Sequence, residues 1–177
     1  MTPNDMEFVK EFLSGNKNAF RFLMERYSGL CKYHIRSGWG LDSETAEDLT
    51  QEVFIKVYQN AERLRPDSHF KSWLMTILRN VVLDHLRKAP QKNKAISLEK
   101  DLPLAAPETQ NIRKLIIGEA LAKLPERQKE IVLLFYFWEL SSVEIGKVMN
   151  LPEGTVRSDL HQARIRIAEL LEDADSL

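Results

Sequence analysis

The chain has little of the chemistry that crosslinks small proteins or holds metals. Cys31 is its single cysteine, so no disulfide can form within the chain, and no Cys/His cluster has the spacing of a zinc finger. No P-loop or nucleophile motif occurs either. The histidines lie on separate segments without metal-ligand spacing, and each is expected to be a surface or hydrogen-bonded residue: His34, His69, His85 and His161. We therefore expect no metal, no cofactor and no enzymatic activity.

Long apolar runs are also absent. No segment has the roughly 18 uninterrupted apolar residues needed to cross a bilayer, and the start of the chain, MTPNDMEFVKEF, lacks the basic and apolar blocks of a signal peptide. Hydrophobic residues make up 44% of the chain and charged residues 29%, the balance of a globular protein with a packed core. We expect a cytoplasmic protein with no direct membrane insertion.

An excess of positive charge is missing as well. The sequence has 25 Lys+Arg against 26 Asp+Glu, a formal net charge of -1, and no dense basic block. Proteins that bind duplex DNA gain much of their affinity by neutralising phosphates with Lys and Arg. Any DNA binding by this chain therefore needs support from other contacts.

The strongest break in composition is KAPQKNKAISLEKDLPLAAPETQN, residues 88–111. It holds three of the seven prolines and no aromatic residue, which is typical of an extended connector. Elsewhere apolar residues recur at helical spacing, and no segment alternates as a half-buried strand does. We predict an all-α protein with two small helical domains, 1–89 and 111–177, joined by a flexible linker at 90–110. The expected helices span 4–14, 18–37, 43–62, 69–88, 111–123, 126–138, 142–149 and 154–172.

A helix-turn-helix is predicted near the C-terminus. Ser141 precedes Glu144 by the spacing of a capping box, Pro152 lies near the next helical start, and Gly146 is expected to let another helix approach closely. The last helix has an inward apolar stripe at helical spacing: Val156, Leu160, Ala163, Ile167 and Leu170. Its other side carries small or hydrogen-bonding side chains, as a recognition helix in a major groove does: Thr155, Arg157, Ser158, His161 and Gln162.

Two readings of this last helix stay open at this point. It is either a DNA-reading helix or part of a plain helical hairpin with a solvated face. In the same way, Arg164 and Arg166 suit phosphate contact or are ordinary surface charges.

The helix expected at 43–62 has two different sides. Its apolar stripe predicts a core on one side: Ala46, Leu49, Val53 and Val57. The opposite side gathers carboxylates and an amide around an aliphatic residue: Asp48, Gln51, Glu52 and Ile55. Carboxylates repel phosphate, so this side indicates a protein-docking patch. The alternative is a solvated face with one stray isoleucine.

The helix expected at 69–88 has an inner stripe and a polar aromatic side. The stripe consists of Phe70, Leu74, Leu78 and Val81. The second side carries Trp73, Thr76, Asn80, Asp84 and Arg87, and an indole beside such groups could stack on an unpaired base. The preceding turn adds Arg63 and Arg65. The alternative for Trp73 is a core residue.

Three segments, EDLTQEVFIKVY, HFKSWLMTILRNVVLDHLRK and LPERQKEIVLLFYFWELSSVEIGKVMNLPEGTVRSDLHQARIRI, follow one another in this order. Together they resemble bacterial RNA polymerase sigma factors of the extracytoplasmic-function group, in their polymerase-docking segment, minus-10 segment and minus-35 helix-turn-helix. The resemblance implies a region 2 domain at 1–89 and a region 4 domain at 111–177. It implies a transcription initiation factor that binds core RNA polymerase and directs it to promoters.

The resemblance also implies roles for particular residues and a further partner. Asp48, Gln51, Glu52 and Ile55 would bind polymerase; Arg63, Arg65, Trp73, Asn80 and Arg87 would bind melted minus-10 DNA; Thr155, Arg157, Ser158, His161, Gln162 and Arg164 would bind the minus-35 duplex. Asp84 would be structural. Asp159 and Gln162 stand where many members of the group carry basic residues, so the resemblance does not define the exact promoter sequence. An anti-sigma factor is the further partner.

The balanced charge leads to one hypothesis about affinity. We expect weak binding to promoter DNA by the free chain and strong binding once polymerase holds both halves, because linked sites raise each other's effective concentration. The rival reading is a stand-alone regulator with a helix-turn-helix. It leaves the patch of Asp48, Gln51 and Glu52 and the helix that carries Trp73 without a role. Tight DNA binding without polymerase would favour that rival.

Overall fold

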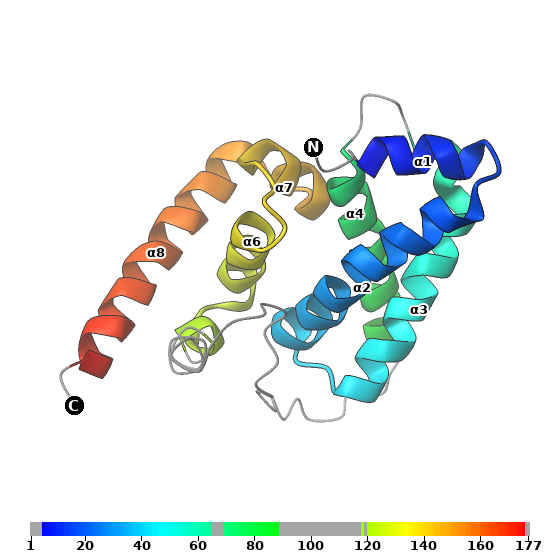
Figure 1. Cartoon of the computed structure of the whole chain (residues 1–177). Coiled ribbons are helices and arrows are strands. Elements are labelled where there is room, and N and C mark those ends of the chain that lie inside the picture. The colour runs from blue at the N-terminus through cyan, green and yellow to red at the C-terminus, as the bar shows by residue number, and fades with distance from the viewer. Residues whose placement is uncertain (1–4, 65–68, 89–117, 119, 176–177) are drawn as a thin grey trace.

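The computed structural model describes residues 5–64, 69–88, 118 and 120–175, the last four by their backbone alone (Figure 1). All regular elements in this part of the chain are helical, which confirms the predicted all-α class. The elements are α1 (Asp5–Leu13), α2 (Lys17–Trp39), α3 (Ser43–Asn60), the 3-10 turn η1 (Ala61–Arg63), α4 (Phe70–Lys88), α6 (Glu126–Tyr136), α7 (Ser142–Met149) and α8 (Glu153–Asp175). The linker predicted at 90–110 lies outside the described residues.

Local side-chain chemistry sets the ends of these helices. Gly40 ends α2 in the left-handed conformation, with φ at 65°, which a residue without Cβ adopts at no steric cost. Two residues later Asp42 begins α3, because its carboxylate accepts a hydrogen bond from the backbone N–H of Thr45 at 2.8 Å. The same contact holds the pKa of Asp42 below its usual value. A short, rigid corner therefore fixes α3 against α2.

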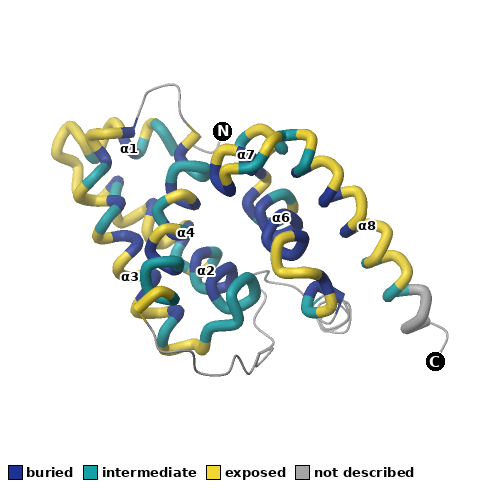
Figure 2. Tube along the Cα trace, turned by 180° about the vertical axis from the view of Figure 1, so that it is seen from behind, coloured by how far each residue is buried: buried dark blue, intermediate teal, exposed yellow. Residues whose placement is uncertain are grey.

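The predicted inner stripes of α3 and α4 are buried as expected. Ala46, Leu49, Val53 and Val57 of α3 are in the core, and so are Phe70, Leu74, Leu78 and Val81 of α4. In α8 the stripe is buried only over its first part, where α6 packs against it. Ile167 and Leu170 are half-buried near the far end of α8 (Figure 2).

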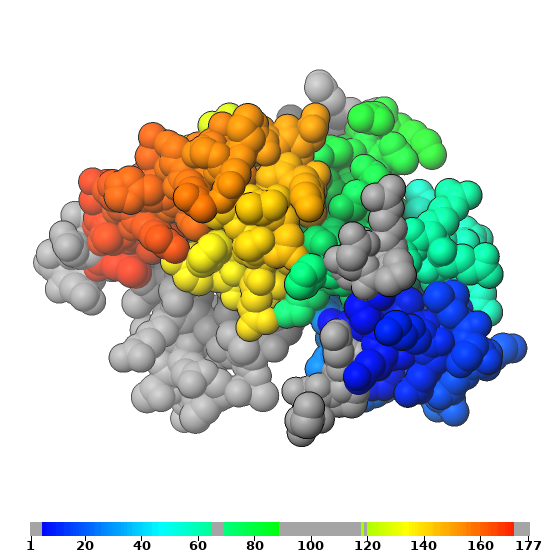
Figure 3. All heavy atoms as spheres, turned by 90° about the horizontal axis from the view of Figure 1, so that it is seen from above, coloured from blue at the N-terminus to red at the C-terminus, as the bar shows by residue number. Residues whose placement is uncertain are grey.

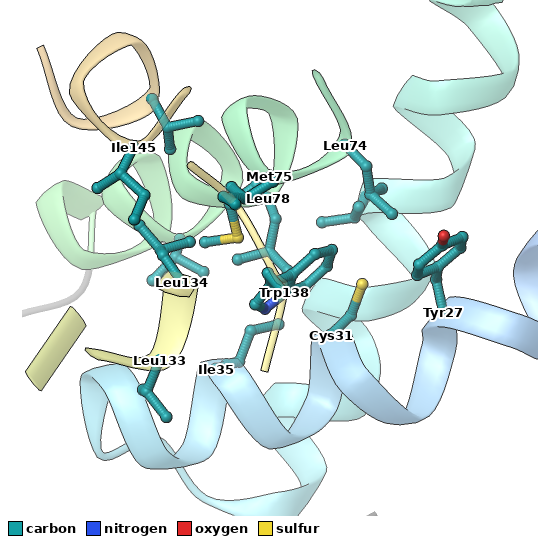
Figure 4. Packing of buried hydrophobic residues seen from close by; sticks show 14 of the residues in the cluster. Tyr27, Cys31, Ile35, Leu74, Met75, Leu78, Leu133, Leu134, Trp138 and Ile145 are labelled. Atoms are coloured by element: carbon teal, nitrogen blue, oxygen red, sulfur yellow. The ribbon is translucent and has the colours of Figure 1, made fainter. Parts of the chain in front are cut away.

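The two halves of the chain pack against each other. The sequence did not indicate whether they touch; in the structure α6 lies against α2, and α7 lies against α4 (Figures 1 and 3). Trp138, in the loop after α6, has no exposed surface and is inserted among residues of α2 and α4 (Figure 4). Its ring stacks parallel to Tyr27 with 6.2 Å between centroids. One continuous apolar core therefore runs through both halves.

Ion pairs at the edge of this contact connect the same helices. Arg79 of α4 donates from Nε to Glu130 of α6 at 3.0 Å, and Lys71 of α4 donates to Glu139 in the loop before α7 at 2.5 Å. These basic residues lie on the side of α4 that faces α6 and α7. The side that carries Asn80 and Arg87 points away from them and is exposed.

Candidate nucleic-acid interface

The turn between α7 and α8 is built by a few backbone requirements. Ser141 and Glu144 form the predicted capping box, with Ser141 N–H donating to Glu144 Oε2 at 2.9 Å. Asn150 ends α7 in the left-handed conformation, with φ at 55°. A Cβ on Gly146 would lie 2.7 Å from the carbonyl oxygen of Leu151. Gly146 is therefore required by the turn itself, whereas we had expected it to admit another helix.

The outward side of α8 matches the predicted reading face. Arg157, Ser158, His161 and Gln162 are exposed, and Thr155 is half-buried at the edge. Arg157 pairs with Glu153 one turn earlier, at 2.5 Å. The structure therefore brings all five predicted residues to one accessible side of the helix that follows the turn.

Asp159 is next to these residues in the sequence but lies on the side of α8 that faces α6. It is buried, and Arg127 of α6 donates from Nη2 to its Oδ1 at 3.0 Å while Nε lies 2.7 Å from its Oδ2. A carboxylate neutralised in this way adds no bare negative charge to the reading face. Asp159 therefore anchors α8 to α6 through its pairing with Arg127.

Three further hydrogen bonds connect α8 to α6 beside the reading face. Gln128 donates to Gln162 at 3.1 Å, and Arg166 donates to Gln128 at 3.2 Å. Arg164 donates from Nε to the hydroxyl of Tyr136 at 2.9 Å, and its guanidinium lies over the Tyr136 ring at 5.8 Å from the centroid. Arg164 and Arg166 are thus held in place rather than free in solvent.

Gln128, Arg127 and Tyr136 were not predicted to be parts of this region. A signal for Gln128 was present, because it is an uncharged polar residue on the same helical side as Ile131 and Val132, where the apolar run begins. A buried amide must find hydrogen-bond partners. Arg127 and Tyr136 gave no comparable signal, since their roles arise only from the way α6 crosses α8.

The predicted docking patch on α3 is exposed as a unit. Asp48, Gln51 and Glu52 surround Ile55, whose side chain is 56% exposed, the largest value among the exposed large apolar residues. Glu52 pairs with Lys56 at 3.0 Å, which leaves the other carboxylate and the amide of the patch to face solvent. The helix α3, which carries the patch, lies on the side of the molecule away from α6, α7 and α8 (Figure 1).

The residues predicted to bind melted DNA are only partly described. Trp73 is half-buried and tilted against Phe70 with 6.1 Å between ring centroids, so its indole serves the core and also has an accessible edge. Asn80, Arg87 and Arg63 are exposed. Asp84 pairs with Arg87 at 3.4 Å, consistent with the structural role expected of it. Arg65 lies outside the described residues.

His34 corrects the expectation that each histidine is exposed or fully hydrogen-bonded. It is buried where the two halves meet, and its Nδ1 accepts from the indole N–H of Trp138 at 3.2 Å, while its Nε2 has no hydrogen-bond partner among the described residues. Burial lowers the pKa of His34 from 6.5 to about 3. Protonation would also place a proton on the atom that accepts from Trp138. His34 is therefore neutral in the packed arrangement.

We predict that acidification destabilises the folded chain through buried His34. Because the pKa of His34 is lower in the folded chain, its contribution to stability is complete above pH 6.5 and is lost as the pH falls from 6.5 toward about 3. Between pH 7.5 and 5.5 this one group should raise the ratio of unfolded to folded chain about tenfold. Urea unfolding at the two pH values measures it. His34→Gln should remove this part of the difference, and an equal pH effect in that variant would contradict the assignment.

No helix in the described part of the chain is long and apolar enough to span a bilayer.

Comparison with known proteins identifies the class to which this arrangement belongs. The family model for sigma-70 region 2 matches residues 23–91, and that for sigma-70 region 4 matches residues 114–167. The RNA polymerase sigma-H factor of Pseudomonas aeruginosa is 32% identical, covering 95% of this chain and 94% of that protein. The ECF RNA polymerase sigma factor SigW of Bacillus subtilis is 26% identical, covering 93% and 95%.

A solved structure shares the fold. The sigma factor RpoE from Bartonella quintana, crystallised with the anti-sigma factor NepR, superposes with a TM-score of 0.68 at 22% identity, covering 86% of this chain and 96% of that one. This likeness shows the fold, in which a helix-turn-helix domain follows a helical domain. The chain belongs to the sigma-70 family of RNA polymerase sigma factors, in its extracytoplasmic-function (ECF) group. It is a transcription initiation factor that directs polymerase to promoters.

Proposed function

We propose that this chain binds bacterial core RNA polymerase through α3 and recognises a promoter through α4 and α8. Asp48, Gln51, Glu52 and Ile55 form the polymerase contact. Arg63, Trp73, Asn80 and Arg87, with Arg65 of the preceding turn, contact melted minus-10 DNA. Thr155, Arg157, Ser158, His161, Gln162 and Arg164 contact the minus-35 duplex. The observation that carries the proposal is that the described members of these three sets each lie on an accessible side of their helix.

The proposal includes a division of labour with the polymerase. The chain supplies recognition and strand capture, and nucleotide addition belongs to the polymerase, so the chain itself is not an enzyme. It works in the cytoplasm, where the DNA is. Domain limits of 1–89 and 111–177, with a flexible linker at 90–110, fit this use, because a linker lets each domain reach its own element.

The packed arrangement must open during this function. A compact chain of 177 residues has a radius of gyration of about 16 Å, so it spans about 40 Å. The minus-35 and minus-10 elements lie about 25 base pairs apart, or about 85 Å along the duplex at 3.4 Å per pair. The two domains therefore separate before both elements are bound. We propose that an anti-sigma factor, as crystallised with the Bartonella quintana relative, holds the chain closed.

In vitro transcription tests the proposal directly. Bacterial core polymerase is combined with the purified chain and a pool of promoter fragments, and the start sites are mapped. We expect a set of starts that share two upstream elements and that are absent without the chain. Tight sequence-specific binding by the free chain, with no transcription, would favour the stand-alone regulator.

Replacing Trp73 should impair promoter melting. Stacking on an aromatic ring contributes about 1–3 kcal/mol per base, so Trp73→Ala should slow opening of duplex promoters about tenfold or more. The loss should be smaller on promoters whose minus-10 region is already unpaired, because the cost of unstacking is then absent. Open complexes are counted by permanganate footprinting.

Trp73→Phe is the matched control for stacking, since it retains a ring against Phe70. It should recover most of the activity. Equal losses on duplex and pre-melted promoters, together with a lower unfolding temperature, would assign Trp73 to the core alone.

A further inference from the structure

Three side chains at the edge of the reading face form a directed chain of hydrogen bonds. Arg166 donates from Nη1 to Oε1 of Gln128 at 3.2 Å. Gln128 then donates from Nε2 to Oε1 of Gln162 at 3.1 Å. Gln128 is in the first turn of α6 and only 5% exposed, whereas Gln162 is exposed on α8 one turn before Arg166. A buried amide therefore connects a surface arginine to a surface glutamine on the reading face.

Chemistry fixes the direction of this chain. A guanidinium has only donors, so the atom of Gln128 that faces Arg166 must be its carbonyl oxygen. The amide nitrogen of Gln128 then faces Gln162 and requires an acceptor, which only the carbonyl oxygen of Gln162 supplies. Turning either amide over would set donor against donor, and a buried donor without a partner is costly. Gln162 is left with its NH₂ group to offer to a ligand.

We propose that Gln128 and Arg166 are specificity-determining positioning residues, which make Gln162 a donor-only reader of one base in the minus-35 element. This inference rests on the proposed function. A glutamine with both ends free is bidentate to adenine, whose edge offers an acceptor and a donor. With only its NH₂ group available, Gln162 favours bases that present acceptors in the major groove. Guanine presents two acceptors, thymine presents one, and cytosine presents only a donor.

Reversing the direction of these hydrogen bonds should reverse the base preference of Gln162. In Gln128→Glu the side chain has nearly the same size and shape but accepts at both oxygens. One oxygen accepts from Arg166 and the other accepts from Gln162, whose amide must now turn so that its carbonyl oxygen faces the groove. The carboxylate suits its place in the first turn of α6, where negative charge is favourable, and it is balanced by Arg166.

Selection by holoenzyme tests this inference. Core polymerase with the wild-type chain or with Gln128→Glu transcribes a promoter library that is randomised over the upstream element, and the transcripts are sequenced. The wild type should prefer G or T over C at one position, and the variant should prefer C or A there, each by about fivefold. Preferences at the other positions should stay the same. An unchanged preference, or a uniform loss at all positions, would overturn the inference.

Two more variants show whether the change acts through Gln162. Gln128→Met removes the directing amide and should flatten the preference at that position without reversing it. Gln128→Glu combined with Gln162→Ala should show no preference there. A reversal that persists without the Gln162 amide would overturn the inference.

A measurement on the free chain separates this inference from the proposed function. In ¹⁵N-edited NMR spectra, the side-chain amide protons of Gln128 should exchange slowly in the wild type, and those of Gln162 should exchange slowly in Gln128→Glu. If the slowly exchanging amide protons do not belong to Gln128 in the wild type and to Gln162 in the variant, the proposed direction of the hydrogen bonds is contradicted, even where transcription works. A wild-type holoenzyme that enriches no upstream element would instead overturn the proposed function.

Discussion

The double variant Gln51→Ala with Glu52→Ala should lose nearly all binding to core RNA polymerase. Both side chains are exposed beside Ile55, and truncating two central polar anchors of an interface typically costs about 2 kcal/mol or more for each. Together the two losses should raise the dissociation constant about 1,000-fold. Promoter-dependent transcription should fall with it, because we expect a chain with a formal net charge of -1 to have little affinity for DNA by itself. Binding is measured by fluorescence anisotropy with labelled chain and core polymerase.

A control on another helix shows whether the effect belongs to the patch. Glu25 is an exposed carboxylate of α2, and Glu25→Ala should bind polymerase as the wild type does. The double variant should keep its helical circular dichroism and its unfolding temperature, since neither residue is in the core. Normal assembly of holoenzyme by a folded double variant would show that α3 is not the docking helix.

The individual helices could be predicted because the apolar spacing and the capping residues of each one lie within its own segment of the sequence. The stripes of α3 and α4 repeat at helical spacing, and every residue assigned to them is buried. The spacing of Ser141 and Glu144 predicted the start of α7, and the structure contains this capping box. Such patterns depend on residues a few positions apart, where backbone geometry alone decides which side chains share a side.

Contacts between distant segments could not be predicted in this way. Trp138 and His34 lie 104 residues apart and meet only because α6 packs on α2. No period in the sequence links a loop after one helix to a pocket in another domain. The pairing of Asp159 with Arg127 could not be predicted for the same reason, since the crossing of α6 and α8 brings the two residues together. The outward side of α8 was predicted, but the side chains that orient it were not.

Trp138→Ala should open the chain. Trp138 is fully buried between α2 and α4, and removing such a side chain costs about 3–5 kcal/mol. It also deletes the indole donor to His34 and the ring that stacks on Tyr27. Trp138 occupies the part of the continuous core where the two halves meet, so the cost falls mainly on the contact between them. The radius of gyration from X-ray scattering should rise well above the value of about 16 Å for the compact chain.

Opening should in turn strengthen the apparent affinity for polymerase. A protein whose competent state is only partly populated binds with an affinity reduced by that fraction, and a variant that shifts the population removes the reduction. Phe54→Ala is the matched control, because Phe54 is a buried aromatic residue of α3 that touches Phe20 within the first domain. It should lower the unfolding temperature without enlarging the folded chain. If Trp138→Ala stays compact, or loses its helices along with its compactness, then Trp138 supports the fold and the domains do not separate at this contact.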